Sequence, residues 1–161
     1  MDEASAWQRA ELTALWLAGG KGIDRLSMLL TLLALAVACT GGRDVPVQLA
    51  LLSAALLGAV EKFYAVRVAF DRRVFASWGA HWRGMEPCDP QPLLAEFDQA
   101  LVSMRLRSAA QRATRPLDER LAGACALFRK QAICLGAQFC AVLTAACVHL
   151  IRPDWPFHHG F

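Results

Sequence analysis

The sequence predicts an all-α integral membrane protein with three transmembrane helices and a small cytoplasmic helical bundle. Apolar residues make up 56% of the 161 residues, and charged residues only 19%, below the roughly 25% usual for soluble domains. The apolar residues are also gathered into long uncharged runs and are not spread at amphipathic spacing, which is typical of membrane spans. The net charge of +3 is too small to indicate a nucleic-acid partner.

An N-terminal amphipathic helix is expected within residues 1–22. Ser5 is a plausible N-cap, and Gly19-Gly20 is expected to break the chain before the first span. Tryptophans beside charged residues suggest a helix that lies at a membrane interface. An ordinary helix packed on the rest of the protein fits the same residues equally well.

A transmembrane helical hairpin is predicted over residues 23–70. Its first span is the uncharged stretch Leu26–Gly42, seventeen residues or about 25 Å of helix, at the short limit for crossing a bilayer. A turn follows, and Pro46 suits the first turn of the second helix. No breaker occurs before about Trp78, so the second helix is expected to project beyond the bilayer.

The rest of the chain is predicted to form a cytoplasmic helical insert (71–130), a third span (131–151) and an outer-face tail (152–161). Helices are expected over 91–113 and 116–151. The third span carries no formal charge over 21 residues and is the strongest spanning segment.

The insert is expected to close into a bundle with the ends of the second and third membrane helices. Apolar residues recur there at helical spacing, so that one face of each helix can be buried. The predicted core comprises Phe63, Phe70, Val74, Phe75 and Trp78, packed against Leu93, Phe97, Leu101, Met104, Leu117, Leu121, Leu127 and Phe128.

The basic residues predict the orientation. Three precede the first span and twelve lie between the cores of the second and third, whereas only Arg43 and Arg152 fall on the other side. The positive-inside rule then places the N-terminus in the cytoplasm. We expect a multi-pass protein of the bacterial inner (plasma) membrane, in contact with membrane lipid.

Charged residues at matched depth form the first candidate site. Asp24-Arg25 and Glu61-Lys62 each lie about 27 Å of helix from the turn of the hairpin, which is the level of the inner boundary. Opposite charges at one level predict a structural ion-pair cluster of all four residues. The alternative is a translocation or proton-relay role for the pair Glu61-Lys62, because ionisable residues in spans are often functional.

Small residues at four-residue spacing predict close helix packing. The residues singled out are Ala50, Ala54 and Gly58 in the second span and Ala132 and Gly136 in the third, where Cys140 and Thr144 continue the series. Such spacing also arises by chance in an Ala-rich chain. It fits a three-helix bundle, self-association or a membrane protein partner.

Polar residues within the spans are interpreted as structural. Gln138 is expected to make an interhelical hydrogen bond in preference to binding a ligand. His149, His158 and His159 gather near the outer face and are weak candidates for Cu or Zn ligands, since no carboxylate or thiol completes a recognised spacing. No cofactor is expected.

Six cysteines show no CxxC pattern and are expected to act as small apolar residues. Ala36-Val37-Ala38-Cys39 resembles the end of a cleaved signal peptide, so removal of the first span is an alternative. No Lys or Arg occurs in the first seven residues, which argues against cleavage.

No enzyme signature is present: the sequence has no Gly-rich phosphate loop, no GxSxG and no HExxH. The leading expectation is a non-catalytic membrane subunit or scaffold that acts through helix packing with itself or a partner. A small channel or transporter component, with Gln138, Thr144 or Glu61 lining a pathway, is the alternative. An outer-face metal-handling protein is a further one.

Overall fold

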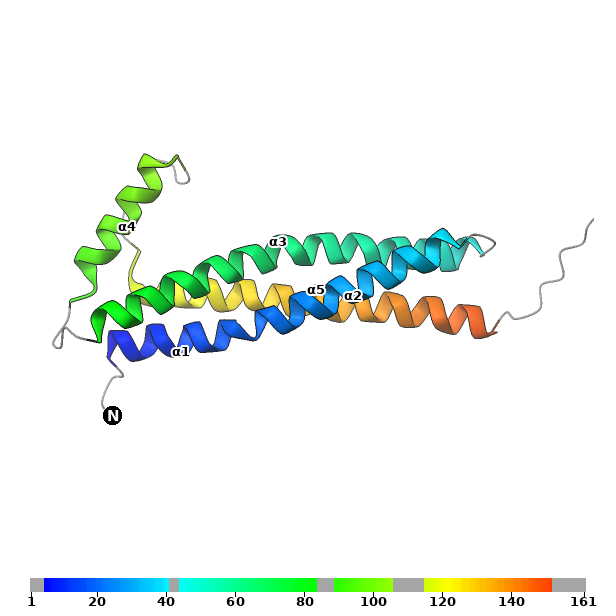
Figure 1. Cartoon of the computed structure of the whole chain (residues 1–161), viewed down its shortest axis with the longest axis horizontal. Coiled ribbons are helices and arrows are strands. Elements are labelled where there is room, and N and C mark those ends of the chain that lie inside the picture. The colour runs from blue at the N-terminus through cyan, green and yellow to red at the C-terminus, as the bar shows by residue number, and fades with distance from the viewer. Residues whose placement is uncertain (1–4, 41–43, 84–88, 106–114, 152–161) are drawn as a thin grey trace, which may run out of the picture. The chain divides into compact units, whose positions relative to one another are not determined.

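The computed structural model describes residues 5–40, 44–83, 89–105 and 115–151, and 92% of these described residues are helical, with no strand among them. The all-α prediction is therefore confirmed. The elements are α1 (Ala6–Ala18), α2 (Gly20–Cys39), α3 (Val45–Trp82), α4 (Gln91–Ser103) and α5 (Leu117–Ile151) (Figure 1).

Three helices are long and apolar enough to cross a membrane, as the sequence predicts. They are Ala6–Cys39, Val45–Trp82 and Leu117–Ile151. The first of these comprises α1 and α2 together. The mean hydropathy of the most apolar 18-residue window in each lies between 1.6 and 1.9.

The predicted break at Gly19-Gly20 is confirmed in part: α1 ends at Ala18, but α2 follows without an intervening loop. Gly19 has helical dihedrals (φ −58°, ψ −25°), and α2 begins at the next residue. A glycine costs a helix about 1 kcal/mol relative to alanine, which packing routinely offsets. Here the Gly20 carbonyl accepts a hydrogen bond from the buried side chain of Gln131, which holds the start of α2 in place.

The ends of the shorter helices follow local rules in part. Ser5 is the N-cap of α1 and its N–H donates to Gln8 Oε1 at 3.0 Å. The helix expected over 91–113 ends earlier, at Ser103, because Arg105 adopts φ 57° and its N–H bonds back to Val102 O. Residues 106–113 of that prediction lie outside the described residues.

The chain divides into two compact units. Unit 1 comprises Met1–Gly19 and Arg67–Phe128, and unit 2 comprises Gly20–Val66 and Arg129–Phe161. Helices α3 and α5 each contribute residues to both units. In unit 2 the remaining helix is α2, and in unit 1 the others are α1 and α4.

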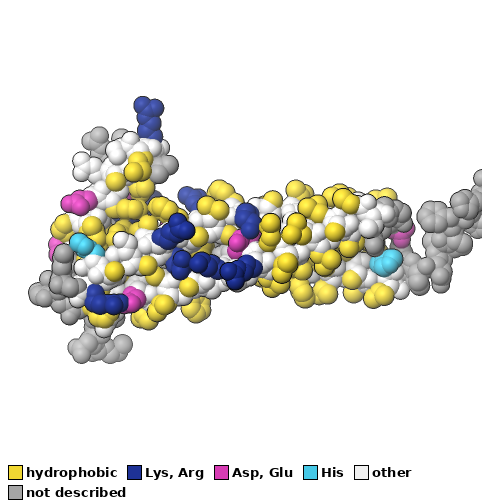
Figure 2. Space-filling view, in the orientation of Figure 1, with side chains coloured by type: hydrophobic (Ala, Val, Ile, Leu, Met, Phe, Trp, Pro, Cys, Tyr) yellow, Lys and Arg dark blue, Asp and Glu magenta, His cyan; other side chains and the backbone are white. Residues whose placement is uncertain are grey.

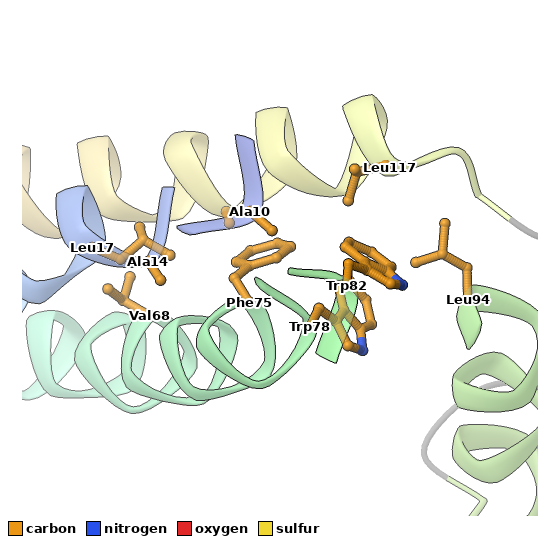
Figure 3. Packing of buried hydrophobic residues seen from close by; sticks show 10 residues of the cluster. Ala10, Ala14, Leu17, Val68, Phe75, Trp78, Trp82, Leu94 and Leu117 are labelled. Carbon is orange, nitrogen blue, oxygen red and sulfur yellow. The ribbon is translucent and has the colours of Figure 1, made fainter. Parts of the chain in front are cut away.

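Unit 1 has an aromatic core. Figure 3 shows Phe75, Trp78 and Trp82 of α3 lying among small and aliphatic side chains of α1, α4 and α5. Trp82 is only 1% exposed, and its ring centroid lies 5.7 Å from that of Trp78. The cluster comprises Ala10, Ala14, Leu17, Val68, Phe75, Trp78, Trp82, Leu94, Leu117 and Ala124.

The predicted core is confirmed in part. Phe75, Trp78 and Leu117 are buried, and Val74, Leu93, Phe97, Leu121, Leu127 and Phe128 pack against the cluster. Phe63, Phe70 and Met104 are instead more than half exposed. Helix α1 also packs on the rest of unit 1, as one of its two interpretations expected, and it adds Ala10, Ala14 and Leu17 to the core, which the predicted list did not include.

Unit 1 also contains a buried ion pair. Arg120 of α5 donates to Asp98 Oδ2 of α4 at 2.5 Å, and the two side chains are only 12% and 8% exposed. The guanidinium lies 5.8 Å from the ring centroids of Trp78 and Phe97. More exposed pairs, Arg83–Glu11 and Arg9–Asp118, connect α1 to α3 and α5.

Unit 2 is a three-helix arrangement with the spacing of a coiled coil. Within it, α2, the first part of α3 and the last part of α5 lie side by side (Figure 1). The buried residues of α3 alternate at intervals of four and three, the pattern of left-handed helix packing. They are Val47, Leu51, Ala54, Gly58, Glu61 and Ala65. Glu61 is thus the one charged residue at a core position of this stretch.

Candidate buried polar site

Two glutamines of α5 place fully buried amides in unit 2. Gln131 and Gln138 are both 0% exposed and lie seven residues apart, so they share one helix face. Gln131 bonds to the carbonyl of Gly20, and Gln138 bonds to that of Ser27. Both pairs are separated by 111 positions, which means that α2 and α5 run parallel in a fixed register.

Gln138 has partners for every polar atom of its side chain. Ser27 Oγ donates to Gln138 Oε1 at 2.8 Å, and Gln138 Nε2 donates to Ser27 O at 3.1 Å and to Thr31 Oγ1 at 2.8 Å. Ser27 is 1% exposed. A buried amide with satisfied donors and acceptors locks two helices together without an energetic penalty for its burial.

Gly58 of α3 makes this network possible. A Cβ atom at Gly58 would lie 2.0 Å from Thr31 Oγ1 and 2.9 Å from Gln138 Nε2. Such a short approach requires one of the groups to move. The absence of a side chain therefore lets α3 pass directly over the hydrogen bonds between α2 and α5.

Gln131 connects Glu61 to the start of α2. Its Nε2 donates to Glu61 Oε1 at 2.7 Å and to Gly20 O at 3.0 Å. Glu61 is 0% exposed. Among the described residues, Glu61 Oε2 and Gln131 Oε1 have no hydrogen-bond partner. The described core of unit 2 therefore contains two neighbouring buried acceptor atoms without a donor.

The predicted four-residue ion-pair cluster is brought together only in part. Lys62 Nζ pairs with Asp24 Oδ1, and these side chains are 43% and 36% exposed. Arg25 is exposed. Glu61 is not at the surface beside them but in the core, because consecutive helical residues point about 100° apart and only one of Glu61 and Lys62 can face outward.

The small residues predicted to pack divide between two environments. Ala54 and Gly58 are buried and Ala50 is partly buried, all within unit 2. Ala132 and Gly136 are exposed, and a Cβ at Gly136 would meet nothing within 4 Å. The described part of the chain does not pack on them as predicted, because α5 turns Gln131, Gln138 and Ala145 inward instead.

Of the three histidines proposed as metal ligands, the structure describes only His149. His149 borders an apolar pocket of about 270 Å³ between α2, α3 and α5, whereas His158 and His159 lie outside the described residues. Over residues 5–40, 44–83, 89–105 and 115–151, no group of three or more His, Cys, Asp or Glu side chains could hold a metal. The five cysteines in that part of the chain are free thiols.

Comparison of the chain with protein-family models, with curated proteins and with solved structures gives no match. The site is therefore interpreted from its own geometry. Sequence reasoning missed Gln131, because it counted this residue only as the start of an uncharged run. The available signal was its seven-residue spacing from Gln138, which repeats the buried position of the same helix.

Proposed function

We propose that the chain is a three-span integral membrane protein of the bacterial inner membrane and acts as a non-catalytic subunit or scaffold through helix packing. Exposed large apolar residues on all three helices of unit 2 support insertion, since lipid would cover them. On α2 they include Leu29 and Leu33, on α3 Leu49 and Leu56, and on α5 Ile133, each more than half exposed. Figure 2 shows this largely uncharged face.

The charges of unit 2 support a cytoplasmic N-terminus. Exposed or partly exposed cations gather at the end of the unit where α2 begins, and Figure 2 shows Lys and Arg side chains gathered where the apolar face ends. They are Lys21 and Arg25 on α2, Lys62 on α3, and Arg129 and Lys130 on α5. Under the positive-inside rule this end faces the cytoplasm.

The observation that carries the scaffold proposal is the free small-residue face of α5. This face carries four exposed small residues, so residues 5–40, 44–83, 89–105 and 115–151 do not use it for packing among themselves. They are Ala132, Gly136, Cys140 and Thr144. In lipid, helices associate where small residues let their backbones approach closely. A second copy or a membrane partner is the occupant that fits such a face.

Oxidative cross-linking tests this proposal in the membrane. A variant that retains Cys140 as its only cysteine is expected to form a disulfide-linked dimer under mild oxidant if two copies meet through this face. In the same variant, Gly136→Leu is expected to reduce the dimer yield by tenfold or more, because the side chain would separate the helices, while the helical content stays unchanged.

A variant that retains only Cys39, which is exposed on α2, is the matched control and should not cross-link. If Cys140 gives no dimer, a co-purifying partner that Gly136→Leu releases still supports the scaffold. A monomer without a partner in mild detergent, unaffected by Gly136→Leu, would contradict it.

A transport component is the second candidate, and Glu61 is the observation that favours it. A carboxyl group at a core position of a membrane helix is a functional hypothesis by default. Ion flux in liposomes containing the purified protein, abolished by Glu61→Gln with normal folding, would support this candidate over a scaffold.

A further inference from the structure

Glu61 is a charged residue in the place of an apolar one. We propose that Glu61 and Gln131 bind one small monovalent cation, a proton or a sodium ion, inside unit 2. The site does not depend on the scaffold role, because it lies on the inward faces of α3 and α5 and away from the exposed small-residue face.

Within the described ranges, no cationic side chain forms an ion pair with Glu61. Its neighbour Lys62 pairs with Asp24, and Lys21 of α2 and Lys130 of α5 are exposed. The Cys134 thiol of α5 also lies close enough to Glu61 to interact with it, but it supplies no positive charge. An ionised carboxylate that is fully buried without a counterion is strongly disfavoured, so a bound cation would remove the main cost of this arrangement.

The available ligand atoms select the kind of cation. Glu61 Oε2 and Gln131 Oε1 are buried acceptors without partners among the described residues. Both are hard oxygen ligands, which suit a proton or an alkali cation rather than a soft transition metal. One carboxylate balances one positive charge, and a divalent cation would usually need more acidic ligands.

The site lies at the charged end of unit 2, since Glu61 and Gln131 are each next in sequence to a lysine, Lys62 and Lys130. The Lys62–Asp24 pair lies next to it along α3 and is partly exposed. Coordination of cations by carboxylates and backbone carbonyls between packed helices is a recurrent arrangement in membrane proteins.

The test uses the purified full-length protein in detergent, with sodium chloride as the probe and N-methylglucamine chloride as the sodium-free control at equal ionic strength. Sodium should raise the Tm of the wild-type protein by several degrees in a saturable way if sodium is the ligand. The Glu61→Gln variant keeps a side-chain oxygen that can accept the hydrogen bond from Gln131 but removes the negative charge. The Tm of this variant should therefore not change with sodium. Asp24→Asn, the carboxylate control, should respond like the wild type.

Labelling identifies a proton as the ligand. Dicyclohexylcarbodiimide reacts with protonated buried carboxyl groups, and mass spectrometry locates the adduct. If the Tm does not respond to sodium, labelling of Glu61, with Asp24 unlabelled, assigns the proton. A wild-type Tm equal in both salts, together with no label on Glu61 at any pH, would overturn the proposal. Neither the Tm response nor the labelling depends on self-association. The cation-site proposal can therefore fail while the scaffold proposal stands.

Discussion

Gly58→Ala is expected to destabilise unit 2 by about 1–3 kcal/mol or more, the usual range for overpacking a core. The added Cβ would lie 2.0 Å from Thr31 Oγ1, so the helices must separate or the Gln138 network must break. Away from such a contact, Gly→Ala in a helix stabilises it by up to about 1 kcal/mol, which makes the expected loss of stability a specific result.

The matched control is Gly136→Ala, on an exposed face with open space around it. Thermal unfolding in detergent, followed by circular dichroism, should show a lower Tm for Gly58→Ala and an equal or higher Tm for Gly136→Ala. Adding Thr31→Ala to Gly58→Ala should recover part of the loss, because it removes the hydroxyl group that clashes. Equal effects at the two glycines would contradict the close approach of α3 to the Gln138 network.

Arg120→Ala is expected to destabilise unit 1 by about 3–5 kcal/mol, the usual cost of breaking a buried ion pair by removing one partner. Asp98 would keep its charge in a site where its side chain is 8% exposed. The substitution also removes the hydrogen bond to Arg115 O and the contacts of the guanidinium with Trp78 and Phe97.

Arg83→Ala is the control, because its pair with Glu11 is 57% and 37% exposed and such pairs contribute about 0–1 kcal/mol. Limited proteolysis should cut α4 of the Arg120→Ala protein much faster than that of Arg83→Ala, and the tryptophan emission should shift to the red as Trp78 gains water. Equal proteolysis of the two variants would mean that the Asp98–Arg120 pair does not hold α4.

Much of the helical layout could be predicted from the sequence. Uncharged runs and the absence of breakers identified α3 and α5 as single long helices. The glycines at 19 and 20 correctly indicated where α1 ends, but not that α2 begins at once, because local propensity does not include the hydrogen bond that Gln131 makes to Gly20.

The sequence predicted how deep the residues of the candidate site lie along the helices, but not which of them face the core. Helical rise is constant, so counting from the hairpin turn placed Asp24 and Lys62 at one level, and the structure pairs them. Which of Glu61 and Lys62 faces the core depends on how α3 is rotated about its axis. Packing against α5 fixes that rotation, and α5 is separated from this part of α3 by a long insert whose path no local pattern describes.

The central claim, that the chain crosses the membrane three times with its N-terminus in the cytoplasm, is tested most directly by labelling a variant whose only cysteine is Cys88. That residue lies between α3 and α4, outside the described residues. A membrane-impermeant maleimide should label it in inverted inner-membrane vesicles and not in intact spheroplasts. Labelling in intact spheroplasts, or release of the protein from membranes by alkaline carbonate, would contradict the claim.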